Sequence, residues 1–287
     1  MNYSALIQNR KSTREFTDKE ITFSQLETIR NYYYNSVRRL VPEIRTELYC
    51  FGPGTGAALE GAAGYNQFLV GAPQYLVLLS EKHELAEINA GYVMQDLLLK
   101  LADMELDTCW LTFTDSDDVK GVLGIDSHKD VVAIAAFGYG EKTTRRLRWN
   151  VRSMSSLDSK AQRQYFQPKK GISELVFLEE WGSRSGVEEH IGFYDDMLWE
   201  AFYAASLSPS YLNRQPYGFL IRDGRITLVQ KPDSYTGGID AKLNLGIVLL
   251  HFSAVASHWA GEVTWQPEEN SSLPLPEGHR AVASVAL

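Results

Sequence analysis

The segment Ala90-Gly-Tyr-Val-Met-Gln-Asp-Leu-Leu-Leu99 lies in a long apolar stretch whose spacing predicts a helix. A second long apolar stretch with helical spacing runs over 240–260. When the two stretches are overlaid, Gly91 falls on Gly246, an offset of 246 − 91 = 155 residues. Side-chain identity between the two stretches is low, so the evidence that they are related comes mainly from the predicted elements around them. We interpret the two helices as the centre of an internal duplication.

The elements predicted around these helices recur in the same order. In the first half, the pattern predicts helices at 3–9, 24–39 and 84–105 and strands at 75–80 and 131–137. In the second half, it predicts helices at 194–207 and 240–260 and strands at 217–222, 225–230 and 281–286. The polar, basic segment 150–171 is interpreted as a connector. The sequence therefore predicts an α+β fold of two related halves, 1–155 and 156–287, packed against one another.

Composition places the chain among ordinary globular proteins. Of its 287 residues, 44% are hydrophobic and 22% charged. The longest apolar runs, such as 76–79 and 247–250, are far shorter than the roughly 20 residues of a membrane span, and no apolar leader is evident. We therefore expect a cytoplasmic protein with no membrane segment. A net charge of −8 disfavours nonspecific binding to nucleic acid.

Cysteine and histidine do not form a catalytic or metal-binding pattern. Cys50 and Cys109 lack metal-ligand or CxxC spacing, so we expect two isolated buried thiols, with a disulfide between them as the alternative. The six histidines are scattered without a paired acid, and no metal site is expected. His251 and His258, both on the second long apolar helix, are interpreted as buried histidines whose hydrogen bonds are satisfied. No side-chain nucleophile or acid–base residue is predicted.

A basic motif, Arg10-Lys-Ser-Thr-Arg14, follows the first short helix. Arginine offers a planar fork of donors that suits phosphate, and the hydroxyls add further hydrogen bonds. A second cluster, which includes Arg145 and Arg146, lies near the middle of the chain. In an acidic protein, such clusters can mark an anion site. The alternative is solvated charge, or a basic helix end that offsets its own dipole.

A polar loop, Ser208-Pro-Ser-Tyr-Leu-Asn-Arg-Gln-Pro216, lies between an apolar helix and an apolar strand. Its backbone is expected to be partly buried, so its polar groups need partners. Ser210, Asn213 and Gln215 could satisfy the loop itself. They could equally present donors and acceptors to a polar heteroaromatic ligand.

Several of these segments resemble the flavin-dependent nitroreductases. The basic motif and the following Phe16 are similar to that family's Arg-x-Ser-x-Arg-x-Phe opening, and the polar loop is similar to its Ala-Pro-Ser-Ser-x-Asn-x-Gln-Pro loop. The 90–99 segment resembles the family's long dimer-forming helix, and Asp107-Thr-Cys-Trp110 resembles its Gly-x-x-x-Cys-Trp strand. The matches lie in separate places across both halves, and the resemblance extends to the fused, single-chain branch known as the TM nitroreductases.

The resemblance implies a single site per chain. Family members are homodimers in which each FMN site takes its basic residues from one subunit and its Pro-Ser-Ser loop from the other. Here the basic motif occurs only in the first half, because its counterpart near Lys170-Gly-Ile-Ser-Glu174 lacks arginine. The polar loop occurs only in the second half, because its counterpart in 41–64 lacks the Ser-x-x-Asn pattern. The expected fold is thus a nitroreductase-like intramolecular pseudo-dimer, active as a monomer, with one flavin site between pseudo-twofold-related halves.

The resemblance also assigns roles to individual residues. Those expected to hold the FMN phosphate and ribityl chain are Arg10, Lys11, Ser12, Arg14, Arg145 and Arg146. Pro209, Ser210, Tyr211 and Asn213 would line the isoalloxazine from the second half, although Tyr211 stands where a second serine is usual. The backbone of Leu111, Thr112 and Phe113 would face flavin N5.

The implied reaction is reduction of bound FMN by NADH or NADPH, followed by reduction of a small acceptor such as a nitroaromatic or quinone. The alternatives are a flavin-binding protein of the same fold without turnover, or a flavin-dependent dehydrogenase or dehalogenase. A glycine-rich segment, 52–64, could form a mobile lid over the flavin, or it could be an irregular surface loop.

Overall fold

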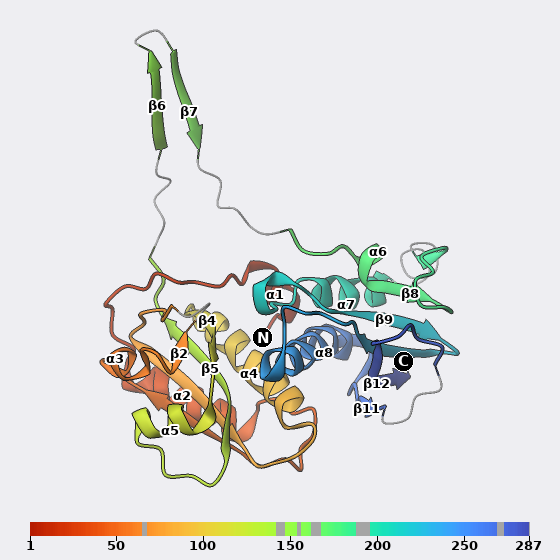
Figure 1. Ribbon diagram of the computed structural model, residues 1–287, viewed down its shortest axis with the longest axis horizontal. Helices are drawn as coiled ribbons and strands as arrows, with labels where there is room; N and C mark the ends of the chain where they lie inside the picture. Colours follow the sequence, from red (N-terminus) through yellow and green to blue (C-terminus); the bar gives the residue numbers. More distant parts are fainter. Residues whose placement is uncertain are drawn as a thin grey trace.

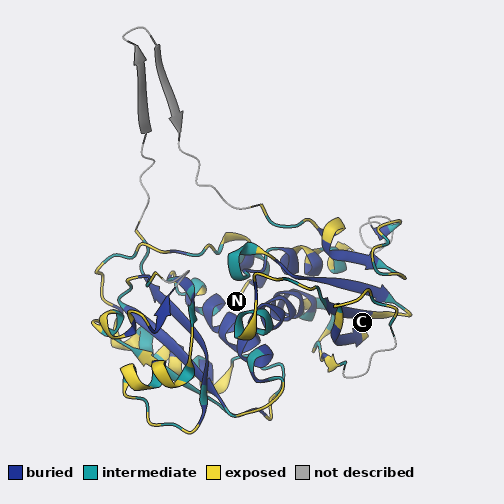
Figure 2. Ribbon diagram, in the orientation of Figure 1, coloured by how far each residue is buried: buried dark blue, intermediate teal, exposed yellow. Residues whose placement is uncertain are grey.

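Two lobes lie side by side in the computed structural model, and a pair of long helices fills the space between them (Figure 1). These are α4 (Ala86–Asp103) and α8 (Gly238–Ala260). The structure describes residues 1–64, 68–141, 147–153, 156–161, 168–187, 196–268 and 273–286. Both long helices are buried for most of their length (Figure 2).

Glycine allows α4 and α8 to approach closely where they cross. A Cβ atom on Gly91 would overlap the backbone carbonyl of Leu243, and one on Gly246 would overlap that of Ile88. Any residue larger than glycine would therefore force the helix axes apart. The two glycines aligned by the sequence offset thus meet the partner helix in reciprocal positions.

The first sheet has the strand order β1-β3-β5-β4-β2. Its strands are β1 (Thr46–Phe51), β2 (Ala63–Gly64), β3 (Gln74–Ser80), β4 (Asp107–Phe113) and β5 (Asp130–Gly138). Alternate residues of β3 belong to different cores: Leu76 and Leu78 pack with α4, and Val77 packs with α3 (Thr55–Leu59) and α5 (Ser116–Leu123). The sheet is therefore covered on both faces, with α2 (Phe23–Asn35) packed in the same core as α4.

The second sheet has the order β11-β12-β10-β9-β8. Its strands are β8 (Val176–Leu178), β9 (Tyr217–Arg222), β10 (Arg225–Gln230), β11 (Gln266–Pro267) and β12 (Arg280–Ala286), and the short α6 (Ile172–Leu175) precedes β8. The predicted turn joins β9 to β10, and both of its residues have positive φ, 51° at Asp223 and 71° at Gly224. Phe202 of α7 (Asp196–Ser206) meets Phe219 and Phe252 in an aromatic core between sheet and helices.

The N-terminal segment joins the two lobes. Helix α1 (Tyr3–Asn9) packs against α4, α7 and α8. The chain then runs extended beside β4: the Thr13 amide donates to the Thr108 carbonyl at 2.9 Å, and the Thr17 amide donates to the Tyr139 carbonyl at 2.8 Å. These bonds fix the basic motif, 10–14, along the boundary between the lobes.

The sequence located the main helices and strands, with differences at some ends. The second helix ends at Asn35, before the predicted 39, and residues 194–195 of the predicted 194–207 helix lie outside the described part. The segment 150–171 is more than a connector, because β6 (Leu147–Ser153) and β7 (Ser156–Ala161) form an antiparallel hairpin that extends away from the lobes (Figure 1). Backbone groups pair regardless of side-chain polarity, so the polar composition concealed it. The boundary predicted at 155 stays a prediction.

The expectation of two buried thiols is wrong for one of them. Cys50 is exposed on β1, an edge strand, whereas Cys109 is buried, and both are free thiols. Helix α8, at 23 residues, is long and apolar enough to cross a membrane by length and composition. In the most apolar window of α8, 78% of the residues are buried inside the protein, so its apolar character is that of a core helix.

Candidate functional site

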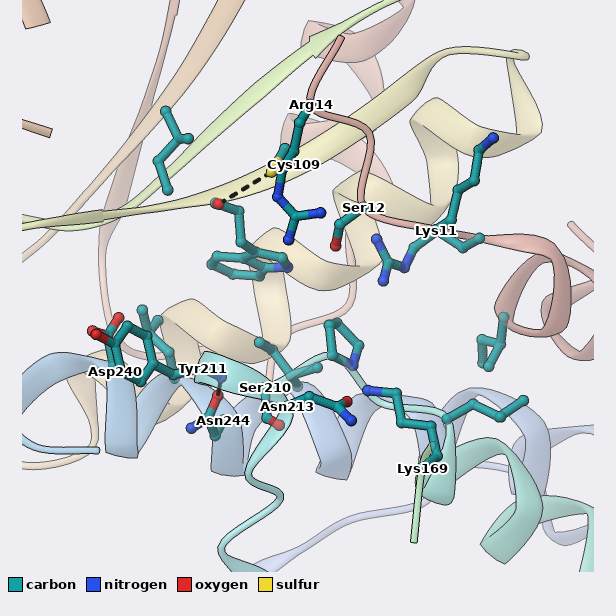
Figure 3. A pocket seen from close by; sticks show the side chains of 18 of the residues that line it. Lys11, Ser12, Arg14, Cys109, Lys169, Ser210, Tyr211, Asn213, Asp240 and Asn244 are labelled. Carbon is teal, nitrogen blue, oxygen red and sulfur yellow. Dashed lines mark hydrogen bonds between the residues drawn. The ribbon is translucent and has the colours of Figure 1, made fainter. Parts of the chain in front are cut away.

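A cavity of about 950 Å³ lies where the N-terminal segment, β4 and the second lobe meet (Figure 3). A volume of this order suits a cofactor-sized ligand. Its lining residues are Ile7, Gln8, Asn9, Arg10, Lys11, Ser12, Arg14, Cys109, Trp110, Leu111, Thr112, Pro168, Lys169, Leu207, Pro209, Ser210, Tyr211, Asn213, Asp240, Leu243, Asn244 and Ile247. Ser12 and Asn213, which the sequence places 201 residues apart (213 − 12), thus border one space.

The structure brings most of the predicted site residues together. Arg10, Lys11, Ser12, Arg14, Leu111, Thr112, Pro209, Ser210, Tyr211 and Asn213 all line the cavity. Phe113 does not: it ends β4 opposite Ala63 of β2 and packs toward the core on the far side of the sheet. Leu111 shares that core cluster and that face of β4, but of the two only Leu111 also borders the cavity. Arg145 and Arg146 lie outside the described residues.

Two cations without ion-pair partners mark one end of the cavity. The Nη1 of Arg10 is buried and has no hydrogen-bond partner among the described residues, and burial lowers the pKa of this guanidinium to about 10. Lys169 donates from Nζ to the Ser208 carbonyl at 2.8 Å. Burial first, and the charge of Arg10 second, lower the pKa of Lys169 to about 8. Two desolvated like charges are unfavourable unless an anion joins them, so this end suits an anionic ligand group.

Several side chains of the polar loop form hydrogen bonds that stabilise the loop and its neighbouring segments. Gln215 is fully buried; its Nε2 donates to the Ser206 carbonyl at 2.7 Å and its Oε1 accepts from the Lys170 amide at 2.9 Å. The Oγ of Ser210 accepts from the Gln215 amide at 3.0 Å, and the Nδ2 of Asn213 donates to the Pro168 carbonyl at 3.1 Å. Gln215 therefore has the purely structural role, whereas Ser210 and Asn213 stabilise the loop and also line the cavity.

The loop backbone is held in an uncommon conformation. Leu212, Asn213 and Gln215 have φ of 47°, 56° and 46°, in the left-handed region that non-glycine residues seldom adopt. Leu212 and Asn213 lie in the 3₁₀ helix η2 (Tyr211–Asn213). The Tyr211 amide donates to Oδ1 of Asn244 on α8 at 3.1 Å, and this bond ties η2 to the floor of the cavity.

A buried chain of hydrogen bonds supports the wall opposite that loop. The Nε1 of Trp110 donates to Oε1 of Gln95 at 2.9 Å, and the Nε2 of Gln95 lies 2.9 Å from Nε2 of His251. Because an indole nitrogen can only donate, Gln95 must donate to His251, whose Nδ1 then donates to the Ala204 carbonyl at 3.1 Å. Burial lowers the pKa of His251 to about 3, so the ring is neutral. The prediction of a buried, satisfied histidine is confirmed for His251 and is wrong for His258, which is exposed.

The glycine-rich segment is more ordered than an irregular loop. It contains α3 and β2, and the Thr112 hydroxyl donates to the Gly64 carbonyl at 3.2 Å. No described residue of 52–64 lines the cavity. Its interpretation as a mobile lid stays a prediction.

Sequence reasoning missed twelve of the 22 lining residues, and four of these bear most on the site: Trp110, Lys169, Asp240 and Asn244. Trp110 had been quoted only as part of a motif. Lys169 lay in the supposed connector. Asp240 and Asn244 share a face of α8 with Leu243 and Ile247, and their i, i+4 spacing was the available signal for a polar stripe on an apolar helix.

Comparison with known proteins gives a family and a fold. The family described as "Putative TM nitroreductase" matches residues 2–176. A crystal structure from Thermotoga maritima, of a protein described as a putative nitroreductase, has a TM-score of 0.61 and 18% identity and covers 100% of this chain and 94% of its own. An FMN-dependent nitroreductase from Clostridium difficile R20291 has a TM-score of 0.43 and 18% identity, covering 57% of this chain and 98% of its own. No curated protein matches the chain.

Proposed function

The chain belongs to the TM nitroreductase family, and on that premise we propose that it is an oxidoreductase that binds one FMN between its two halves. The observation that carries this proposal is the unpaired cationic end of the cavity. Arg10 and Lys169 come from segments far apart in the sequence and have no counter-ion among the described residues. A phosphate dianion placed there would supply the missing charge.

The rest of the cavity suits a flavin ring and its polyol chain. Ser12 lies beside the cationic end, where its hydroxyl can bind the ribityl chain (Figure 3). Trp110 and Pro209 offer apolar surface to the cavity, as a planar heteroaromatic ring requires. Arg145 and Arg146 remain candidates to complete the phosphate clamp. FMN would supply the redox chemistry, accepting hydride and passing electrons on.

The protein's own groups would orient the cofactor and set its electrostatic surroundings. The hydrogen-bond chain from Trp110 to His251 fixes one wall of the cavity and keeps it from moving with each turnover. The positive charge of Arg10 and Lys169 gives affinity for the phosphate, and Ser210 and Asn213 hold the loop on the opposite side. We propose NADH or NADPH as the donor, and a nitroaromatic or quinone as the small acceptor.

We also propose that the two halves form an intramolecular pseudo-dimer. Gly91 meets Leu243 and Gly246 meets Ile88, and the partners are themselves related by the same offset, since 243 − 88 = 155. A second reciprocal pair, Asn89 and Asn244 (244 − 89 = 155), supports the same relation. Oδ1 of Asn89 accepts from the amides of residues 40 and 41, and Oδ1 of Asn244 accepts from Tyr211. An internal interface of this kind replaces that of a homodimer, so we expect a monomer, located in the cytoplasm.

The cheapest test of the proposal is the colour of the purified protein. Bound oxidised flavin gives an absorbance band near ~450 nm. We expect that band in the wild-type protein, or after addition of FMN, and its loss in Arg10→Ala, while the melting temperatures of the two FMN-free proteins should agree. Arg30→Ala, which removes an exposed arginine on α2, serves as the matched control and should keep the band. A wild-type protein that binds no FMN would refute the proposal.

Turnover separates an enzyme from a flavin-binding protein without activity. Anaerobic mixing with NADH or NADPH should bleach the flavin band, and a nitroaromatic or quinone should restore it. Bleaching without recovery by any such acceptor would favour a different flavin-dependent reaction. The absence of bleaching at saturating donor would exclude the enzyme.

A further inference from the structure

The cavity is electrically polarised along its length. Lys169 lies at one end and Asp240 at the other, with Asn213, Ser210 and Tyr211 between them (Figure 3). If the phosphate occupies the cationic end, the polyol chain runs inward and the flavin ring lies toward Asp240. A ligand that reacts with the ring must then enter near this carboxyl group.

Asp240 is not committed to any structural interaction in the described part of the chain. It is half-buried in the first turn of α8, and no hydrogen bond or ion pair engages it. The nearest cation along its own helix, Lys242, pairs with Glu87 of α4 at 3.1 Å. A half-buried carboxyl group without a partner is costly unless a ligand uses it.

The floor beside Asp240 suits a ring. Leu243 and Ile247 follow it on the same face of α8 and line the cavity with apolar surface. Asn244 lies between them, nearly fully buried, and its Oδ1 is already taken by the Tyr211 amide. Asp240 is therefore the charged group at the end of an otherwise apolar and neutral floor.

We propose that Asp240 determines the charge of the ligand that enters beside the flavin, favouring rings that carry a positive charge and excluding carboxylates. The inference rests on the proposed function, and it names the substrate class of that same site. A cation would give the carboxylate the counter-charge it lacks, whereas an anion would add a second negative charge in a desolvated space.

The sign of the pH dependence follows from burial alone. Burial raises the pKa of Asp240 to about 6, and no charged group contributes to this shift. The other titratable side chains that line the cavity are Arg10, Lys11, Arg14, Cys109, Lys169 and Tyr211. Below pH 6 the carboxyl group is protonated and neutral, so the preference for cations should weaken. Above pH 6 it is ionised, and the preference should be complete.

Equilibrium binding of unreactive rings to the FMN-loaded protein tests the proposal without turnover. Benzamidine, benzamide and benzoate are similar in size and differ in charge, and calorimetry or the flavin spectrum reports their binding. At pH 7.5 we expect benzamidine to bind at least about tenfold more tightly than benzoate, a difference of about 1.4 kcal/mol. At pH 5 the ratio should fall, and benzamide should change little with pH.

Variants assign the effect to Asp240. In Asp240→Asn the ratio of benzamidine to benzoate affinity should fall to about one, and Asp240→Glu should restore it. Asp18→Asn removes the same charge from an exposed position outside the cavity and should leave the ratio unchanged. A wild-type ratio near one, or an unchanged ratio in a folded Asp240→Asn, would overturn the inference. Failure to bind FMN at all would instead overturn the proposed function.

Discussion

Raising the pH from 7 to 9 should weaken FMN binding because Lys169 loses its proton over this range. The pKa of its ammonium is lowered from 10.5 to about 8 by burial and by Arg10. A phosphate dianion bound beside it would restore that pKa toward its ordinary value, since the anion replaces the lost solvation. The free protein therefore deprotonates Lys169 well before the complex does.

The magnitude follows from proton linkage. The phosphate has a second pKa near ~6 and stays a dianion throughout, so its own titration adds nothing. Below pH 8 the free Lys169 is charged and ready to bind. Above pH 8, each pH unit costs about tenfold in affinity until the pKa of the complex is reached, so the Kd at pH 9 should be about tenfold that at pH 7. Arg10, whose pKa is about 10, contributes little below pH 9.

Titration of the FMN-free protein with FMN at constant ionic strength measures this dependence. Lys169→Met should bind more weakly at pH 7 and lose the slope, and Lys169→Arg should keep its affinity at pH 9 because arginine remains charged. Riboflavin, which lacks the phosphate, should show no such slope. A wild-type Kd that is constant from pH 7 to 9, or an equal slope in Lys169→Met, would refute the assignment of Lys169 to the phosphate.

Three further predictions concern the core. Gly246→Ala should lower the free energy of unfolding by about 1–3 kcal/mol, because its methyl group meets the backbone of the other long helix. Gly121→Ala on α5, where a Cβ atom would meet nothing within 4 Å, should be neutral or stabilising. Equal melting temperatures for the two variants would contradict the close crossing of the helices. The pKa of His251 is about 3 in the folded state and 6.5 in the unfolded state, so the free energy of unfolding should fall as the pH drops from about 6.5 toward 3. Chemical denaturation at pH 7 and pH 5 should show a smaller decrease in that free energy for His251→Gln than for the wild type. Gln95→Leu should lower the free energy of unfolding by about 1–3 kcal/mol, because it leaves Nε1 of Trp110 and Nε2 of His251 without partners; an unchanged stability in urea would show that these two hydrogen bonds do not contribute.

The sequence pattern predicted the elements well where apolar runs are bounded by turn residues. The 217–222 and 225–230 strands agree residue for residue with β9 and β10, because their apolar runs and the Asp-Gly turn are both local signals. The equivalence of Gly91 and Gly246 was visible as a constant offset, but the close approach of each glycine to the other helix was not predicted. Polar strands such as β6 and β7 gave no such signal.

The cavity was only partly visible in the sequence. The basic motif and the polar loop are short, dense segments, and their composition revealed them. Lys169 and Asp240 stand alone among ordinary neighbours, and only the packing of the two lobes directs them at one space. The shifted pKa values of these two residues result from burial in the folded chain, which the neighbouring sequence does not indicate.

The ratio of bound FMN to protein chains is the decisive measurement for a single flavin site between the two halves. One cavity built from both halves predicts one FMN for each chain in a monomeric protein, measured by flavin absorbance against protein concentration together with the mass in solution. Arg10→Ala should reduce the FMN content to near zero without changing that mass. Two FMN per chain, or one FMN retained in Arg10→Ala, would contradict a single site with its phosphate at Arg10.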